Sequence, residues 1–160
     1  MSKTLIRPMM IQDVPLFLDF YDSLSDDTLF FFRPHPHDHA YLTNLVENIP
    51  NETNTHRFLA YQVVNNHQLM VGYAFLWDMH LQIPWFGVCV RDGFQGQGLG
   101  EMMVSFAKDY VKLHSKGGIL LTTHQHNLRG QRLYRKHGFE TLGLSPEDEY
   151  LMILRIPTPR

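Results

Sequence analysis

The chain has 160 residues, of which 44% are hydrophobic and 19% charged, a composition that fits one domain over residues 1–160 and excludes disordered and fibrous classes. The formal net charge of -2 does not suggest the basic surface that nucleic-acid binding requires. No apolar run approaches the roughly 20 residues of a membrane-spanning helix. Cys89 is the only cysteine and the N-terminus shows no apolar leader, so we expect a cytoplasmic protein without a disulfide or a secretory signal.

The first third of the chain predicts one strand and then helices. Residues 5–7 are a short apolar run that could form a strand. Asp13 stands before apolar residues spaced three and four apart, which indicates a capped helix. Ser25 is placed to cap a short helix, and Asp38 to cap a longer one over residues 39–48.

Strand patterns dominate the middle of the chain. Residues 58–64 and 69–77 are rich in aromatic and β-branched side chains, and the polar turn between them predicts a hairpin. Residues 84–90 form a further apolar run, which is followed by a glycine-rich turn and an amphipathic helix.

The last third alternates strands and helices. We expect Gly117-Gly118 to stop the amphipathic helix and residues 119–123 to form the next strand. Asn127 opens another helix, which Gly138 ends. A closing hairpin is predicted at residues 139–144 and 150–156. Early hairpins and late helix crossovers together predict an α/β fold with a mixed sheet.

The strand, glycine turn and helix at residues 84–111 form a phosphate-binding arrangement. Glycines let the backbone approach an anion closely, and the first amides of the helix point at it. Gly98-Leu99-Gly100-Glu101 lacks the Lys-Ser/Thr ending of a P-loop, and the glycine spacing does not fit the dinucleotide fingerprint. The turn therefore predicts a different phosphate ligand, with a plain tight turn as the alternative.

Two motifs carry a family resemblance. Gln95-Gly96-Gln97-Gly98-Leu99-Gly100 resembles the Gln/Arg-x-x-Gly-x-Gly/Ala signature of the GNAT acyl-CoA N-acyltransferase superfamily, and Val88-Cys89-Val90 fits the family's fourth strand. Residues 127–139 are similar to the family's Asn-x-x-Ala-x-x-Leu-Tyr-x-x-x-Gly-Phe segment, with Gly130 where alanine is common. The resemblance implies a GNAT-like mixed sheet of about six or seven strands, flanked by about four helices, with a splayed strand pair that binds acyl-CoA.

The resemblance also implies an activity, namely transfer of an acetyl group from acetyl-CoA to a primary amine by direct attack in a ternary complex. Val88 and Val90 would pair with the pantetheine arm as with an added strand, and the amide near Val90 would polarise the acyl carbonyl. The remaining cofactor-binding residues would be Gln95, Gly96, Gly98, Gly100 and Glu101, through their backbone amides on the pyrophosphate, and Asn127. Tyr134 is the expected catalytic residue, a donor to the leaving sulfur, with core packing as its alternative role.

The base that deprotonates the amine stays open. Many family members use a glutamate on the fourth strand, but residues 83–90 contain no acid. Asp78, His80, His124 and a water chain to solvent are the candidates.

His35, His37 and His39 alternate along one run and invite a metal interpretation. The run is one residue short of the His-x-His-x-Asp-His pattern of metallo-β-lactamases, and no companion cysteine or acidic cluster is evident. We therefore expect no metal and a loop in which Asp38 caps a helix.

Aromatic side chains and the cysteine have two interpretations each. Seven residues are expected either to pack in the core or to line the acceptor site: Phe30, Phe31, Phe32, Arg33, Trp77, Trp85 and Phe86. Cys89 lies within an apolar strand and is interpreted as a packing residue rather than a nucleophile.

Two other classes of function remain open. One is a non-catalytic acyl-CoA-binding sensor or regulatory domain, against which Tyr134 argues. The other is a metal-binding module built on the three alternating histidines. The sequence leaves the acceptor undetermined, whether small molecule or protein, and a homodimer is expected from the family alone.

Overall fold

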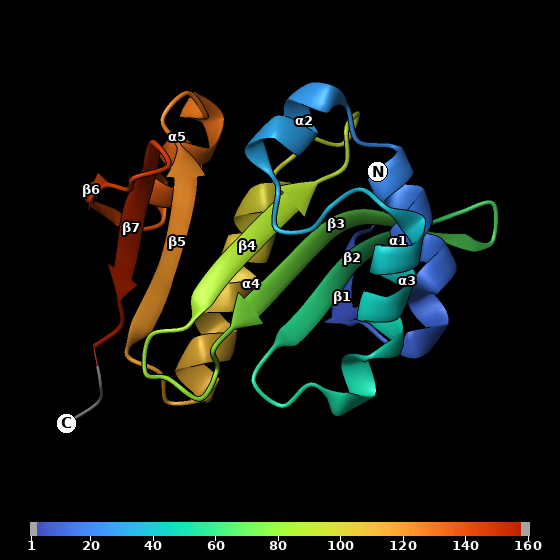
Figure 1. Cartoon of the computed structure of the whole chain (residues 1–160), viewed down its shortest axis with the longest axis horizontal. Helices are drawn as coiled ribbons and strands as arrows, with labels where there is room; N and C mark the ends of the chain where they lie inside the picture. The colour runs from blue at the N-terminus through green and yellow to red at the C-terminus, as the bar shows by residue number, and fades with distance from the viewer. Residues whose placement is uncertain (1–2, 158–160) are drawn as a thin grey trace.

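One mixed β-sheet organises the chain in the computed structural model, which describes residues 3–157 (Figure 1). The strands are β1 (Leu5–Pro8), β2 (His56–Val64), β3 (His67–Trp77), β4 (Trp85–Val90), β5 (Gly118–His124), β6 (Glu140–Leu144) and β7 (Glu149–Arg155). The helices are α1 (Val14–Asp22), α2 (Asp26–Phe31), α3 (His39–Glu47), α4 (Leu99–Leu113) and α5 (Leu128–Lys136). Short 3-10 turns occupy Ile11–Asp13 and Ile49–Asn51.

The sheet has the order β1-β2-β3-β4-β5-β7-β6, in which β4 and β5 are the parallel pair and the other neighbours are antiparallel. This order confirms the expected mixed α/β sheet. No helix in the described part of the chain is long and apolar enough to cross a bilayer.

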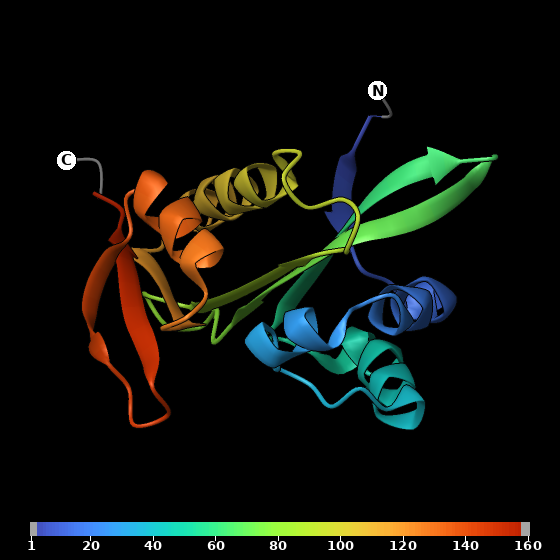
Figure 2. The ribbon, with the colours of Figure 1, turned by 90° about the horizontal axis from the view of Figure 1, so that it is seen from above.

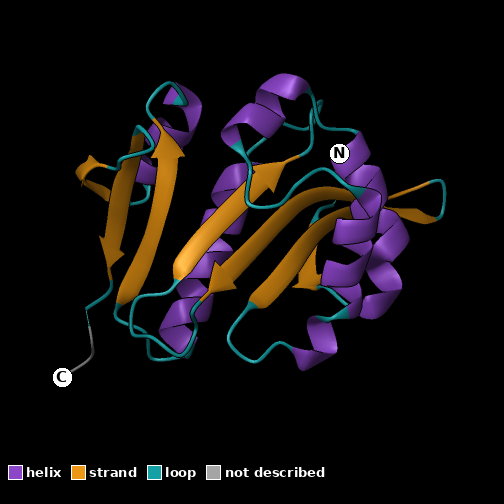
Figure 3. Cartoon of the chain, viewed as in Figure 1, coloured by secondary structure: helices purple, strands orange, loops and turns teal. Residues whose placement is uncertain are grey.

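Helices cover both faces of the sheet. Figure 2 shows α4 and α5 on one face and α1, α2 and α3 on the other, and Figure 3 shows the same layers from the front. Successive residues of a strand point to opposite faces, so Phe58 and Ala60 of β2 pack beneath α4 while Leu59 packs with the α1 layer. Tyr73 and Phe75 of β3 likewise join the α1 layer. Both faces are therefore buried, which explains the nearly continuous apolar runs of the middle strands.

Most local turn and cap signals formed as expected, but Asp13 did not. Asn65 and Asn66 join β2 to β3 with φ of 52° and 65°, the left-handed pair that a tight hairpin requires. The Ser25 side chain accepts a hydrogen bond from the Thr28 amide at the start of α2. Asp38 does the same for the Tyr41 amide at the start of α3. Asp13 precedes α1 without a side-chain bond to the helix, and its carboxylate accepts from the Met10 amide and pairs with Arg7.

The end of α4 differs from the expectation. The helix ends at Leu113, four residues before Gly117, and Ser115 takes the left-handed turn with φ of 58°. Gly118 belongs to β5, where a Cβ would lie 2.3 Å from the carbonyl oxygen of Leu154 in β7. This glycine is needed for close strand approach and not for stopping the helix.

Candidate functional site

β4 has one paired edge and one open edge. It pairs with β3 along its whole length, from Trp77↔Trp85 to Gly72↔Val90. With β5 it shares a single register pair, Trp85↔Leu120. Beyond that pair the two strands diverge toward their carboxyl ends, as Figure 1 shows. The expected splayed strand pair is therefore confirmed.

Strand parity determines which backbone groups face the opening between β4 and β5. The Arg91 amide donates to the Val71 carbonyl in β3 at 2.8 Å, and the Pro84 carbonyl accepts from the Leu120 amide in β5 at 2.9 Å. Polar groups alternate along a strand, so those of Val88 and Val90 point toward β5. The Val90 carbonyl accepts a hydrogen bond from Gln95 Nε2 at 3.1 Å.

The glycine turn ends at the N-terminus of α4. Gly96 and Gly98 have φ of 78° and 82°, which non-glycine residues rarely adopt, and nothing lies within 4 Å of a Cβ built on either. Gly98 is the N-cap residue and has no side chain to satisfy the first helical amides. The turn therefore presents free amides and the positive end of the α4 dipole to open space.

A cavity of about 740 Å³ occupies the space between the splayed strands and the two helices that flank them. Its lining includes every residue expected to bind the cofactor, together with the expected catalytic residue: Val88, Val90, Gln95, Gly96, Gly98, Gly100, Glu101, Asn127 and Tyr134. Residues from β4, the turn, α4 and α5 thus meet around one space, although they are separated in the sequence.

Tyr134 comes from α5 and is 8% exposed, with its ring packed edge-on against Phe139. Burial raises the pKa of its hydroxyl, and the nearby Cys89 thiol raises it further. The phenol is therefore protonated at neutral pH and able to donate a hydrogen bond into the cavity. Cys89 is itself buried, and burial raises the pKa of its thiol, as suits a packing residue rather than a nucleophile.

Asn127 connects the cavity to the start of α5. Its Oδ1 accepts from the Gly130 amide at 3.1 Å, and its Nδ2 donates to Thr123 Oγ1 at 3.3 Å. A Cβ on Gly130 would lie 2.6 Å from Asn127 Nδ2, the far end of a flexible side chain. Alanine there would push the carboxamide of Asn127 out of its present position.

The candidate bases lie outside the cavity lining. Trp77 pairs with Trp85, so Asp78 and His80 follow β3 at the end of the sheet where β4 begins. The strands β4 and β5 separate from Phe86 onward, and neither Asp78 nor His80 is among the lining residues in the described part of the chain. His124 packs on the rings of Phe30 and Phe31, and its Nδ1 accepts from the His126 amide at 3.1 Å. This hydrogen bond occupies Nδ1, and His124 is not among the described residues that line the cavity.

The aromatic candidates divide in the same way. Phe31, Phe32 and Phe86 line the cavity. Trp77 stacks on Phe75 outside the lining, and Trp85 also lies outside it.

A row of cations on α5 was not expected from the sequence. Arg129, Arg132 and Lys136 all line the cavity. Their spacing of three and four residues places them on one helix face, so the signal was present in the sequence. Arg129 donates to Gln95 Oε1 at 2.8 Å, and Lys136 pairs with Glu101, so α5 is bridged to the segment that follows β4.

Asp92 attaches α2 to the same segment. Its carboxylate accepts from the Thr28 hydroxyl at 2.6 Å and from the Ser25 amide. Burial raises the pKa of Asp92, but the hydrogen bonds from Thr28 and Ser25 outweigh it, and the net shift is downward. The ionised carboxylate therefore holds α2, with its lining residues Asp27 and Thr28, beside the cavity.

Comparisons with known proteins agree with this geometry. A family described as Acetyltransferase (GNAT) domain matches residues 54–141, more than half of the chain, whereas no curated protein matches the sequence significantly. The fold is similar to that of spermidine N-acetyltransferase from Vibrio cholerae in complex with CoA and spermine, with 17% identity, a TM-score of 0.80 and 95% of each chain covered.

Two further solved structures show the same fold. Ribosomal-protein-S5-alanine acetyltransferase from Vibrio fischeri has 12% identity and a TM-score of 0.82, over 97% of this chain and 94% of that one. An aminoglycoside acetyltransferase in complex with coenzyme A has 18% identity and a TM-score of 0.73, over 96% of this chain and 95% of that one. The family match spans the open edge of β4, the glycine turn and Tyr134, and the chain belongs to the GNAT family of acetyltransferases.

Proposed function

We propose that the chain binds acetyl-CoA in the 740 Å³ cavity and transfers its acetyl group to a primary amine. The observation that carries the proposal is the convergence of an open strand edge, a cap-free helix N-terminus and a protonated phenol on one space. Two of the similar structures were solved with CoA, which supports the same cosubstrate here.

Each part of the cofactor has a counterpart in the lining. The outward backbone groups of Val88 and Val90 suit the amides of a pantetheine arm, which would add to β4 as a strand. The glycine turn suits the pyrophosphate because it offers amides and a helix dipole. Arg132 and its neighbours on α5 add positive charge for phosphate groups.

The reaction proceeds by direct attack. The lone pair of the neutral amine forms a C–N bond with the acetyl carbon, and the C–S bond breaks. The Tyr134 hydroxyl gives its proton to the departing thiolate, and the amine passes its own proton to water. Tyr134 then recovers a proton from solvent. A water route for the amine proton agrees with the absence of Asp78, His80 and His124 from the described lining.

The absence of Asp78, His80 and His124 from the described lining also favours one alternative, a domain that binds acyl-CoA without turnover, although the carboxylate of Asp27 does line the cavity. The two functions differ in one observable, the release of free CoA thiol in the presence of an amine. The similar structures suggest the panel to use: a polyamine, an aminoglycoside and a peptide with N-terminal alanine.

Calorimetric titration with acetyl-CoA tests the site through two matched variants. Gly98→Ala and Gly93→Ala both place a side chain at positive φ with nothing within 4 Å, so the backbone strain is similar. Gly98 lines the cavity and Gly93 does not. Binding by the wild type that weakens at least about tenfold only in Gly98→Ala supports the proposal. A folded wild type that does not bind acetyl-CoA excludes it.

Two further expectations remain predictions. A cytoplasmic location follows from the single cysteine, and a homodimer from the family resemblance. Fractionation of cells and sedimentation of the purified protein address them.

A further inference from the structure

The three alternating histidines divide into two environments. His35 is 8% exposed, and its Nε2 lies 3.0 Å from the Tyr73 hydroxyl. That hydroxyl also accepts from Arg57 Nη1 at 2.7 Å, so His35 belongs to a buried polar chain. His37 and His39 stay on the surface, and the three histidines do not form one site.

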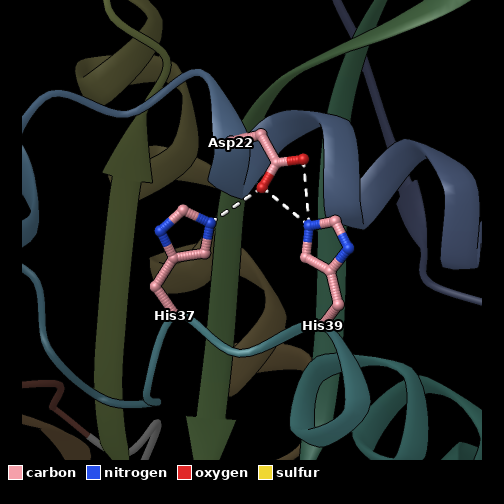
Figure 4. A group of neighbouring side chains, drawn as sticks. All are labelled: Asp22, His37 and His39. Carbon is pink, nitrogen blue, oxygen red and sulfur yellow. Dashed lines mark hydrogen bonds and ion pairs between the residues drawn. The ribbon is translucent and has the colours of Figure 1, made fainter.

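A residue from α1 takes the place of His35. Asp22 Oδ1 lies 2.8 Å from Nε2 of His37 and 2.8 Å from Nε2 of His39, and Asp22 Oδ2 lies 3.0 Å from Nε2 of His39. Figure 4 shows both rings turning the same type of nitrogen toward the one carboxylate. All three potential ligand atoms lie within 4.8 Å of one another.

The backbone explains why the two histidines point the same way. Asp38 lies between them with φ of −138° and ψ of 122°, an extended conformation in which residues two apart share a side. The Asp38 side chain accepts from the Tyr41 amide at 2.8 Å, and the Asp38 amide donates to the Pro36 carbonyl at 3.0 Å. These bonds hold the segment before α3 in the shape that presents both rings.

The position of Asp22 in α1 favours a positive charge beside its carboxylate. It is the last residue of α1, where the helix dipole is negative, and the last turn of α1 carries no basic side chain. A carboxylate at this end is electrostatically unfavourable unless positive charge lies beside it.

We propose that Asp22, His37 and His39 form a binding site for a divalent transition-metal ion, with Zn²⁺ as the best match. Two imidazoles and one carboxylate are ligands that Zn²⁺ takes in proteins, at about 2.0–2.1 Å each. Two ligands at that distance from a tetrahedral ion lie about 3.3 Å apart. The two separations of 2.8 Å between Asp22 and the histidines are about half an ångström shorter, and the two histidine nitrogens lie within 4.8 Å of each other. All three residues are exposed, which leaves the remaining coordination position to water.

The sequence shows no acidic cluster beside the histidines, and in the fold Asp22 takes that place. Asp22 precedes His37 by 15 residues and lies at the end of α1, whereas His37 lies in the segment before α3. A bound ion would fasten the segment before α3 to α1, and His37 also lines a second cavity of about 360 Å³ next to Phe32. The inference does not depend on acyl-CoA binding.

Zinc titration of the untagged, chelator-treated full chain by calorimetry tests the site. We expect one Zn²⁺ per chain for the wild type, and an affinity at least about tenfold lower for Asp22→Asn and for His39→Gln, since even loss of an outer partner of a metal ligand costs that much. His67→Gln is the matched control, because His67 is an exposed histidine on β3 far from Asp22 in the sequence.

Thermal unfolding gives a second readout. Zinc should raise the Tm of the wild type and of His67→Gln but not that of Asp22→Asn, because a ligand that binds only the folded state stabilises it. The proposal is overturned if the wild type binds no zinc, if Asp22→Asn and His39→Gln bind as the wild type does, or if His67→Gln weakens binding equally.

Discussion

The two edges of β4 show how one strand can serve stability on one side and binding on the other. Toward β3 every residue of β4 has a partner, and the Phe75 ring packs against Gly87 in that pair. Toward β5 only Trp85 has a partner, and the remaining length borders a cavity. At Gly87 the pair with β3 has no room for an added methyl group, whereas the edge toward β5 has room for a ligand. Substitutions at the two edges should therefore fail in different ways.

The largest effect is expected at the open edge, in Tyr134→Phe. Loss of the hydroxyl removes the proton donor for the leaving thiolate, so kcat should fall by about 100-fold or more. The acetyl-CoA Kd should stay near the wild-type value, because Phe keeps the buried ring. Tyr110→Phe, outside the cavity lining, is the control. An unchanged kcat in Tyr134→Phe would remove this residue from the mechanism.

Gly87→Ala crowds the β3–β4 pair, and its main readout is stability rather than binding, because Gly87 also lines the cavity. A Cβ at this position would lie 2.1 Å from the Phe75 ring, so the ring or the strand has to move. Overpacking of this kind costs about 1–3 kcal/mol, which lowers Tm by several degrees in thermal unfolding. Gly143→Ala in β6 is the matched strand glycine, with nothing within 4 Å of its Cβ, and should leave Tm nearly unchanged. Equal Tm values for the two variants would contradict the crowding at Gly87.

Arg132→Ala tests the charge on the open side. Arg132 and Arg135 are both exposed on α5, but only Arg132 lines the cavity. The acetyl-CoA Kd should rise about three- to tenfold in Arg132→Ala and much less in Arg135→Ala, as measured by calorimetry at low salt. If both variants weaken binding equally, the effect comes from net charge and not from the cavity.

Asp92→Asn, which affects the attachment of α2, should have the smallest effect. Because the pKa of Asp92 is lowered on folding, the unfolded chain binds more protons than the folded chain near that pKa, and its contribution is lost as pH falls. We expect the wild type to exceed Asp92→Asn in unfolding free energy by about 1 kcal/mol near neutral pH, and the difference to shrink below about pH 4. Urea unfolding near neutral pH and below about pH 4 measures this difference in unfolding free energy. A difference that grows on acidification would contradict the stabilising role of the ionised Asp92.

Local signals in the sequence were enough for most elements and for much of the cavity. The Asn65-Asn66 turn and the capping side chains act within four residues, so their effects do not depend on distant packing. The cavity lining followed from motifs whose glycines and tyrosine have fixed positions relative to α4 and α5. Site roles assigned to those residues stay predictions until binding is measured.

Features that depend on tertiary contact were missed. The end of α4 is set by Ser115, whose left-handed conformation no local pattern indicates, while Gly118 is needed for the approach of β7. The meeting of Asp22 with His37 and His39 requires α1 to lie beside the start of α3, which side-chain spacing alone does not predict. The cation row on α5 is different, because its spacing was readable from the sequence.

The open edge of β4 is also a liability. Unpaired strand edges are templates on which other chains can add and aggregate. In this molecule the edge faces inward, with residues of α2 and α5 on the same cavity, so a foreign strand has no straight approach to it. Because Asp92 bonds α2 to the segment that follows β4, we expect a variant that releases α2 to self-associate before it unfolds.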